Sequence, residues 1–150
     1  KTIEIKNIHA VIDSSLYMLQ QSLENRIEVT KTYTSQNFTL VGNDSNLYKV
    51  FYNVLSNAIY AIDGAGKINI ATKLNDNSVH IVISDTGCGI SEQNMLKILD
   101  PFFTTKPQGK GIGLGLTVAY NILQEHNGSI EFTSEVGKGT SVKIILPLLT

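Results

Sequence analysis

An apolar stripe at helical spacing in residues 45–62 constrains the fold most strongly. Six apolar side chains of this segment fall on one arc of a helix when plotted at about 100° per residue. They are Leu47, Phe51, Val54, Leu55, Ala58 and Ile62. Because such a stripe has to be buried against another layer, the segment predicts a long helix with one core-facing side. Asn43 or Asp44 can cap its start, and Gly64 and Gly66 follow its end.

Two further long helices are expected. The first covers residues 8–23, where apolar residues recur every three or four positions. The other begins near Gly113 and ends before Asn127 and Gly128, a pair typical of a helix C-terminus. A short helix is expected at 92–99.

Strands are expected in pairs. Residues 27–33 alternate β-forming and polar side chains and 38–41 is short and β-prone, so these two segments are expected to pair. Two later pairs have turn-forming residues between their strands and are expected to be hairpins. They comprise 67–74 with 79–85, and 129–134 with 140–146.

This order of elements predicts an α/β (α+β) two-layer sandwich. We expect a mixed, mostly antiparallel sheet of about five strands, covered on one face by three helices. The chain has 150 residues, 42% of them hydrophobic, which suffices for one domain over 1–150 with a single core. A doubly wound parallel sheet is not expected.

Charge and cysteine content limit the classes of partner. The formal net charge of -1, without long blocks of one sign, gives no broad surface for nucleic acid or anionic lipid. The single cysteine, Cys88, excludes an intrachain disulfide and a multi-cysteine zinc site, and favours a reducing compartment. No apolar run approaches the roughly 20 residues that span a bilayer, so no direct membrane contact is expected of this segment. The expected location is the cytoplasm, with any membrane anchor elsewhere in a parent protein.

One polar edge of the 45–62 helix carries side chains suited to a phosphate-bound metal. Asn53 and Asn57 are four residues apart and Tyr60 follows by three, so the three lie within about 60° of one another. Asparagine can approach hydrated Mg²⁺ and phosphate oxygens without the repulsion that a carboxylate would add. Surface asparagines without a ligand are the alternative interpretation of this spacing.

The motif Asp-Thr-Gly-Cys-Gly-Ile at 85–90 stands where the chain leaves a strand. Gly87 and Gly89 allow close backbone approach to a flat ligand. The Asp85 carboxylate is suited to accept a hydrogen bond from an adenine amino group. A plain Asp-Gly turn is the alternative.

A glycine-rich lid is expected before the last long helix. Four alternating glycines at 109–115 run into that helix, whose N-terminus suits a triphosphate. The spacing fits neither the Walker pattern nor the dinucleotide fingerprint. Upstream, the aromatics at 102–103 can anchor one end of the lid while Thr104, Thr105 and Lys106 reach phosphate. For the glycine-rich segment, the alternative is a merely flexible loop. For the segment upstream, the alternative is a pair of aromatics in the core followed by a solvated turn.

In this order and spacing, the motifs resemble those of the GHKL ATPase superfamily of gyrases, heat-shock chaperones, mismatch-repair ATPases and histidine kinases. The segment 53–62 resembles its N box, 85–90 its G1 box, 101–106 its F box and 111–116 its G2 box. The Gly-Lys-Gly-Thr motif at 137–140 resembles its last glycine box. The resemblance covers nearly the whole chain, and the F-box segment is most similar to sensor histidine kinases.

This resemblance implies an ATP site with Mg²⁺. Asn57 would ligate the metal, Asn53 and Tyr60 would approach the phosphates, and Asp85 would bind the adenine amine with support from Thr140, directly or through water. Asn53, Asn57 and Lys106 would be the catalytic residues. The nucleotide-binding residues implied are Asn53, Asn57, Tyr60, Asp85, Gly87, Gly89, Ile90, Phe103, Thr104, Thr105, Lys106, Gly111, Gly113, Leu114, Gly115, Leu116 and Thr140.

The resemblance also implies a reaction. Branches that hydrolyse ATP carry a water-activating glutamate one helical turn before the magnesium asparagine, and here Asn53 occupies that position. Because a neutral amide cannot act as a general base near pH 7, transfer to another nucleophile is favoured over hydrolysis. The expected activity is that of a protein-histidine kinase, which transfers the γ-phosphate of ATP to a histidine in two-component signalling.

The acceptor histidine is expected on a separate domain. None of His9, His80 and His126 is followed by the acidic residue and helix pattern of the family's phosphoacceptor site. The expected partners are the histidine-containing dimerisation domain of a parent kinase and, indirectly, a response regulator receiver domain, with the isolated domain a monomer. Two alternatives remain: a non-catalytic ATP-binding regulatory module, and an anti-sigma-type protein-serine kinase.

Overall fold

The structure is a computed structural model that describes residues 2–91 and 114–149, with the backbone alone at Leu114 and Gly115. The short helix expected at 92–99 and the segment 100–113 lie outside the described residues, so the predictions made for them stay predictions. The elements are, in chain order, β1 (Ile3–Ile5), α1 (Ile8–Met18), α2 (Gln20–Leu23), β2 (Ile27–Thr32), β3 (Leu40–Gly42), α3 (Asp44–Ala61), β4 (Gly66–Asn75), β5 (Ser78–Asp85), α5 (Leu114–Glu125), β6 (Ser129–Glu135) and β7 (Gly139–Pro147).

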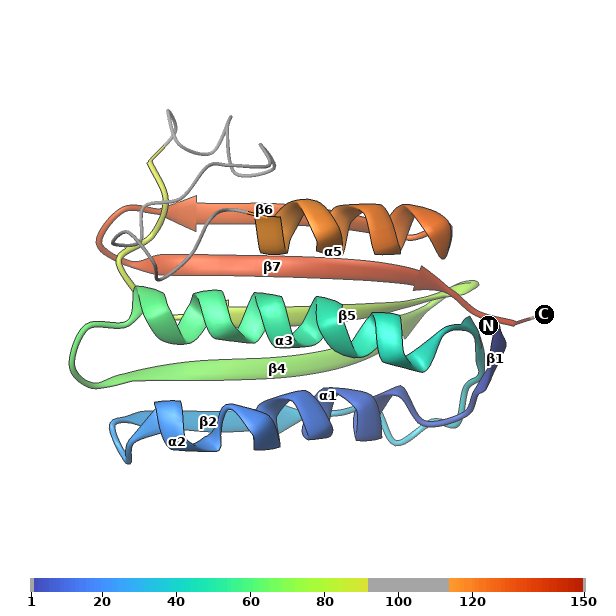
Figure 1. The fold of residues 1–150 in the computed structure, drawn as a ribbon, viewed down its shortest axis with the longest axis horizontal. Helices are drawn as coiled ribbons and strands as arrows, with labels where there is room; N and C mark the ends of the chain where they lie inside the picture. Colours follow the sequence, from blue (N-terminus) through green and yellow to red (C-terminus); the bar gives the residue numbers. More distant parts are fainter. Residues whose placement is uncertain (1, 92–113, 150) are drawn as a thin grey trace.

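Five strands form the main sheet, in the order β2-β4-β5-β7-β6. β2 pairs with β4 in parallel, and the other neighbours are antiparallel. Figure 1 shows α1, α3 and α5 on one face of this sheet, and α3 packs between the other two. The predicted two-layer α/β sandwich with a mixed, mostly antiparallel sheet is confirmed. In the part of the chain that the structure describes, no helix is long and apolar enough to cross a membrane.

The core lies between the helix layer and the sheet. All six side chains of the predicted stripe are buried, five of them on α3 and Ile62 directly after its end, and Phe51 and Leu55 are fully so. On β5, Val79, Ile81 and Ile83 are buried, whereas the residues between them are half-buried on the other face. This alternation follows from a sheet that is covered on one side only.

The start of α3 follows from local sequence. Asn43 is the N-cap, and its side-chain oxygen accepts the N–H of Asn46 at 3.0 Å. Asp44 is the first residue of the helix, where its negative charge complements the helix dipole. The N–H of Asn43 also donates to Nε2 of His126, at 3.0 Å, so the end of α5 is tied to the start of α3.

Two local expectations were wrong. The segments expected to pair as neighbouring strands do not pair: β2 lies beside β4, and β3 pairs instead with β1, which the sequence analysis missed. Alternation shows that a segment is extended but not which partner it takes, and both real partners are distant in sequence. The first helix is also interrupted at Leu19, between α1 and α2.

An aromatic cluster joins α1 to the segment after β2. The ring of His9 stacks on Tyr33 with centroids 4.1 Å apart and meets the edge of Phe38 at 5.7 Å. Its Nε2 lies 2.8 Å from Oγ1 of Thr72 on β4. Burial lowers the pKa of His9, and attraction to Asp13 offsets this only in part. The fold therefore favours the neutral imidazole.

We expect the domain to lose stability as the pH falls below 6.5, the ordinary pKa of histidine. Because the folded-state pKa of His9 is lowered, the unfolded chain binds the proton first, and stability present above 6.5 declines as the pH drops through the folded value. His9→Phe keeps a ring against Tyr33 but cannot be protonated. Urea unfolding at about pH 7.5 and about pH 5.5 should show a smaller pH difference in the variant. Equal pH differences in both proteins would contradict this role of His9.

Candidate nucleotide-binding site

The polar edge of α3 lies where the sequence predicted it. Asn53 and Asn57 are half-buried, and Tyr60 is 44% exposed. Val54 and Ala58, the residues that follow the two asparagines, are buried and fix the rotation of the helix. The two amides therefore lie at the border between the core and the surface.

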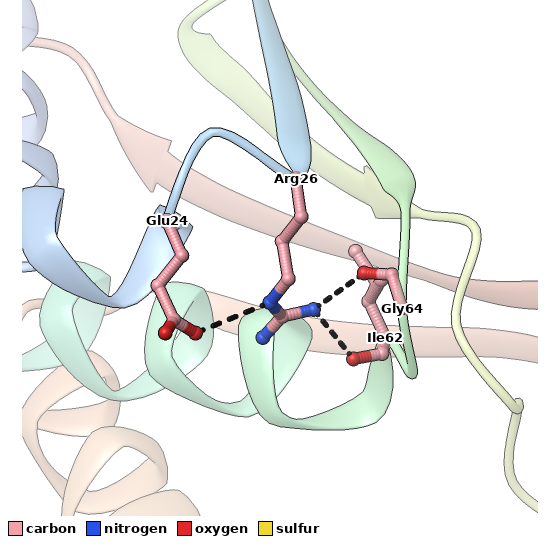
Figure 2. Close-up of polar contacts among 4 residues, drawn as sticks. All are labelled: Glu24, Arg26, Ile62 and Gly64. Carbon is pink, nitrogen blue, oxygen red and sulfur yellow. Dashed lines mark hydrogen bonds and ion pairs between the residues drawn. The ribbon is translucent and has the colours of Figure 1, made fainter.

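The C-terminal end of α3 is held by Arg26, just before β2 (Figure 2). Nη1 of Arg26 donates to the carbonyl oxygens of Ile62, at 2.9 Å, and Gly64, at 2.8 Å. Its Nε donates to Glu24 at 3.4 Å, which keeps the guanidinium oriented. A cation is favourable beside the carbonyls that follow a helix, because they carry partial negative charge. Arg26 thereby fixes the end of the helix that carries Asn57, and the sequence analysis missed it.

Asp85 stands at the end of β5, directly opposite Thr140 on β7. Its Oδ1 accepts the N–H of Gly87 at 2.8 Å, and the backbone N–H of Thr140 also donates to the carboxylate. Burial raises the pKa of Asp85, and the two N–H groups counter part of this effect. Because burial has partly removed this acceptor from water, a further donor at this position would be favourable.

The loop after Asp85 packs closely against the end of α3. The N–H of Cys88 donates to the carbonyl oxygen of Ala61 at 3.0 Å. A Cβ added to Gly87 would lie 2.7 Å from both the Cβ and the carbonyl oxygen of Ala61. Ala61 is one helical turn after Asn57, so the loop contacts the helix close to its polar edge.

On its other side, the loop packs against the turn between β6 and β7. Gly89 has a φ of +78°, and a Cβ there would overlap the carbonyl oxygen of Glu135. The N–H of Gly137 donates to the carbonyl oxygen of Cys88 at 2.8 Å. The close neighbours that the structure describes at Gly87 and Gly89 are therefore Ala61 and Glu135, and the approach of a flat ligand to these glycines stays a prediction.

The structure brings together one part of the predicted residue set. Asp85, Gly87, Gly89, Ile90 and Thr140 form one group at the ends of β5 and β7, next to the end of α3. Leu114 and Gly115 begin α5, and the side chain of Leu116 is half-buried. The remaining predicted residues lie outside the described residues: Phe103, Thr104, Thr105, Lys106, Gly111 and Gly113.

This arrangement has two kinds of polar group on two connected elements. Asp85 offers a partly buried acceptor for an amino group, and α3 offers neutral amides that suit a cation or phosphate oxygens. The donors and acceptors described here fit a purine nucleotide with a divalent cation. Position 53 holds asparagine, whose neutral amide cannot activate a water molecule as a glutamate could.

Residues 42–150 match the family of Histidine kinase-, DNA gyrase B-, and HSP90-like ATPases. The chain belongs to this family, which confirms the resemblance to GHKL ATPases. The match covers α3, the loop after β5, α5 and the turn before β7, and so includes every predicted site residue.

The chain is similar to the kinases of this family. Sporulation kinase A of Bacillus subtilis is 37% identical over 134 residues, which are 89% of this chain and 22% of that protein. The signal transduction histidine-protein kinase AtoS of Escherichia coli is 34% identical over 144 residues, 95% of this chain and 23% of that protein. The chain thus spans less than a quarter of the length of these two relatives.

Solved structures of histidine kinases have the same fold. The nucleotide-free catalytic domain of histidine kinase ThkA is 26% identical, with a TM-score of 0.85 over 98% of this chain and 97% of that one. The mycobacterial sensor histidine kinase MprB is 27% identical, with a TM-score of 0.84 over 99% of this chain and 97% of that one. The fold is therefore that of a histidine kinase catalytic domain.

Proposed function

We propose that this chain is the ATP-binding catalytic domain of a sensor histidine kinase, which transfers the γ-phosphate of ATP to a histidine in two-component signalling. The observation that carries the proposal is Asp85, a partly buried acceptor that the Gly87 N–H holds in place beside the end of the helix that carries Asn57. The similarity to Sporulation kinase A and AtoS over nearly the whole chain supports the same activity.

At the adenine end, Asp85 accepts a hydrogen bond from the amino group of the base. Gly87, Gly89 and Ile90 form the wall beside it, and Thr140 supports the carboxylate through its backbone N–H. The contacts of this loop with Ala61 and with the turn between β6 and β7 keep the acceptor in place before the ligand arrives, which lowers the entropy cost of binding.

At the phosphate end, the amide oxygen of Asn57 ligates Mg²⁺, while Asn53 and Tyr60 approach the phosphates. When bound, Mg²⁺ neutralises charge on the phosphate oxygens. We assign Thr104, Thr105 and Lys106 and the glycine-rich residues 111–116 to the lid over the phosphates. Since the Asn53 amide cannot take a proton from water near pH 7, the γ-phosphate is kept for another nucleophile.

The nucleophile comes from another domain. His9 is stacked and bonded within the aromatic cluster, His126 contacts Asn43 and Ile122, and His80 lies in the middle of β5 between two neighbouring strands. We therefore assign the acceptor to the dimerisation domain of a cytoplasmic or membrane-anchored parent kinase, which passes the phosphate to a response regulator receiver domain. The catalytic domain itself lies in the cytoplasm.

The metal assignment predicts that Asn57→Ala weakens nucleotide binding only when Mg²⁺ is present. We expect the dissociation constant for a non-hydrolysable ATP analogue to rise about tenfold with Mg²⁺, which corresponds to the loss of one polar contact, and to match wild type in EDTA. Isothermal titration calorimetry measures both. Asn46→Ala, at the other end of α3, is the matched control and should bind as wild type. An equal loss with and without Mg²⁺ would place the metal elsewhere.

The transfer step is tested in the parent kinase with ATP labelled at the γ-phosphate. We expect an acid-labile label on the protein, as phosphohistidine gives, and much less label in Asp85→Asn at an ATP concentration that half-saturates the wild type. A label that survives acid and is removed by phosphoserine-directed hydrolysis would favour the protein-serine kinase. ATP binding without any label would favour the regulatory module.

A further inference from the structure

The hydroxyl of Ser134 makes three contacts beside the adenine end of the proposed site. Its Oγ accepts the N–H of Ile90 at 2.7 Å, donates to the carbonyl oxygen of Gly139 at 3.0 Å, and lies 2.8 Å from Oγ1 of Thr140. Ser134 is half-buried on β6, and Thr140 is only 7% exposed. These contacts join the loop after Asp85 to the turn between β6 and β7.

Ser134, Thr140 and Asp85 form a row across three strands. Ser134 lies opposite Thr140 in the β6–β7 ladder, and Thr140 lies opposite Asp85 in the β5–β7 ladder. Residues directly opposite one another in a sheet point to the same face. Ile83 and Val142, two residues away on β5 and β7, are buried against the helices, so the row lies on the helix-covered face.

Only one placement of hydrogens satisfies all three contacts of Ser134. A serine hydroxyl has one proton to donate and two lone pairs to accept with. The carbonyl oxygen of Gly139 can only accept, so it takes the Ser134 proton, and the N–H of Ile90 can only donate. The second lone pair of Ser134 is then left for the Thr140 proton. Thr140 Oγ1 thus has lone pairs, and no proton, for any further partner.

We propose that Ser134 is a positioning residue that sets the choice of purine. By taking the Thr140 proton, it makes Thr140 a hydrogen-bond acceptor next to the Asp85 carboxylate. The row then offers two acceptors, which favour a purine with an amino group at position 6 and disfavour one with an oxygen there. This rests on the proposed function, in which the row meets the base, and it adds a residue that selects ATP over 6-oxo purine nucleotides.

The test compares the dissociation constants for ATP and inosine triphosphate, which carries an oxygen at position 6. We expect wild type to prefer ATP and Ser134→Ala to reduce this preference by about three- to tenfold, because the freed Thr140 hydroxyl can rotate and donate to the oxygen. A purely structural role would weaken both nucleotides equally and leave their ratio unchanged. Calorimetry with Mg²⁺ gives both constants.

Ser84→Ala is the matched control. Oγ of Ser84 lies 3.0 Å from Oγ of Ser141 in the same pair of strands, on the face away from the helices. The Ser84→Ala variant loses a hydrogen bond between two hydroxyl groups, as Ser134→Ala does, but leaves Ser134, Thr140 and Asp85 unchanged. We expect its preference for ATP to equal that of wild type. If Ser84→Ala lowers the preference as much as Ser134→Ala does, the inference is overturned.

A double-mutant cycle with Thr140→Val shows whether Ser134 acts through Thr140. Thr140→Val removes the acceptor with little change in shape, so it should lower the ATP preference by itself, and adding Ser134→Ala should lower it no further. An unchanged ratio in Ser134→Ala, or an equal further loss in the Thr140→Val background, would overturn the inference. If Ser134→Ala does not fold, Thr140→Val alone decides, and an unchanged ratio there would overturn it.

The failure of the inference differs from the failure of the proposed function. Wild type that binds neither nucleotide removes the ATP site and this inference with it. Wild type that prefers ATP, with the same preference in Ser134→Ala, removes the role of Ser134 alone.

Discussion

Asp85→Asn is expected to weaken the binding of an adenine nucleotide by about 10- to 100-fold. The carboxylate is a charged acceptor that burial has partly removed from water, and loss of such a hydrogen bond costs about 1.5–3 kcal/mol. About 1.4 kcal/mol corresponds to a tenfold change in the dissociation constant. Titration of both proteins with a non-hydrolysable ATP analogue measures the effect. A variant that binds within about threefold of wild type would contradict the assignment of Asp85.

The loss should not arise from unfolding. Because burial raises the pKa of Asp85 in the folded state, the ionised carboxylate opposes folding at neutral pH, and a neutral amide avoids that penalty. The amide oxygen of the variant can still accept the N–H of Gly87. Asp76→Asn is the matched control, since Asp76 is an exposed residue in the turn at the other end of the same hairpin. It should bind nucleotide as wild type does.

Gly139→Ala is expected to lower the free energy of unfolding by about 3 kcal/mol. Gly139 has a φ of +134°, which side chains rarely adopt, and backbone strain of this kind costs about 1–3 kcal/mol. An added Cβ would also overlap the carbonyl oxygen of Asp85, and forcing extra volume into a packed site costs about 1–3 kcal/mol. Because the clash is with Asp85 itself, nucleotide binding should weaken as well. Urea unfolding followed by circular dichroism measures the stability change.

Gly137→Ala separates the two causes. Gly137 lies in the same turn with a φ of +85°, but a Cβ there would meet no atom within 4 Å. Only the backbone strain remains, and we expect a loss of about 1 kcal/mol. If Gly139→Ala destabilises the protein no more than Gly137→Ala does, the result contradicts the close contact between Gly139 and Asp85.

The fold could be predicted where the sequence pattern is local. The stripe on α3 has a helical period over a length that no strand reaches, and the hairpin of β4 and β5 has its turn residues between two alternating segments. The pairing of β2 with β4 and of β1 with β3 could not be predicted, because each joins segments far apart in sequence and leaves no pattern in either.

The site could be predicted only where the type of a residue and its neighbours in the sequence indicate its chemical role. Asp85 stands out as an acidic residue at the end of an apolar strand, followed by two glycines. Arg26 and Ser134 do not stand out, because their partners Ile62 and Ile90 are 36 and 44 residues away. The sequence predicted close backbone approach at Gly87 and Gly89, but it gave no sign that Ala61 and Glu135 are the neighbours there.

Titration of the wild-type domain with a non-hydrolysable ATP analogue, with and without Mg²⁺, tests the central claim most directly. We expect saturable binding of one nucleotide per chain that becomes tighter when Mg²⁺ is added, since the asparagine edge of α3 would then hold the metal with the phosphates. The absence of binding at every Mg²⁺ concentration would contradict the account, because the chain would then have the fold of a histidine kinase catalytic domain without its nucleotide.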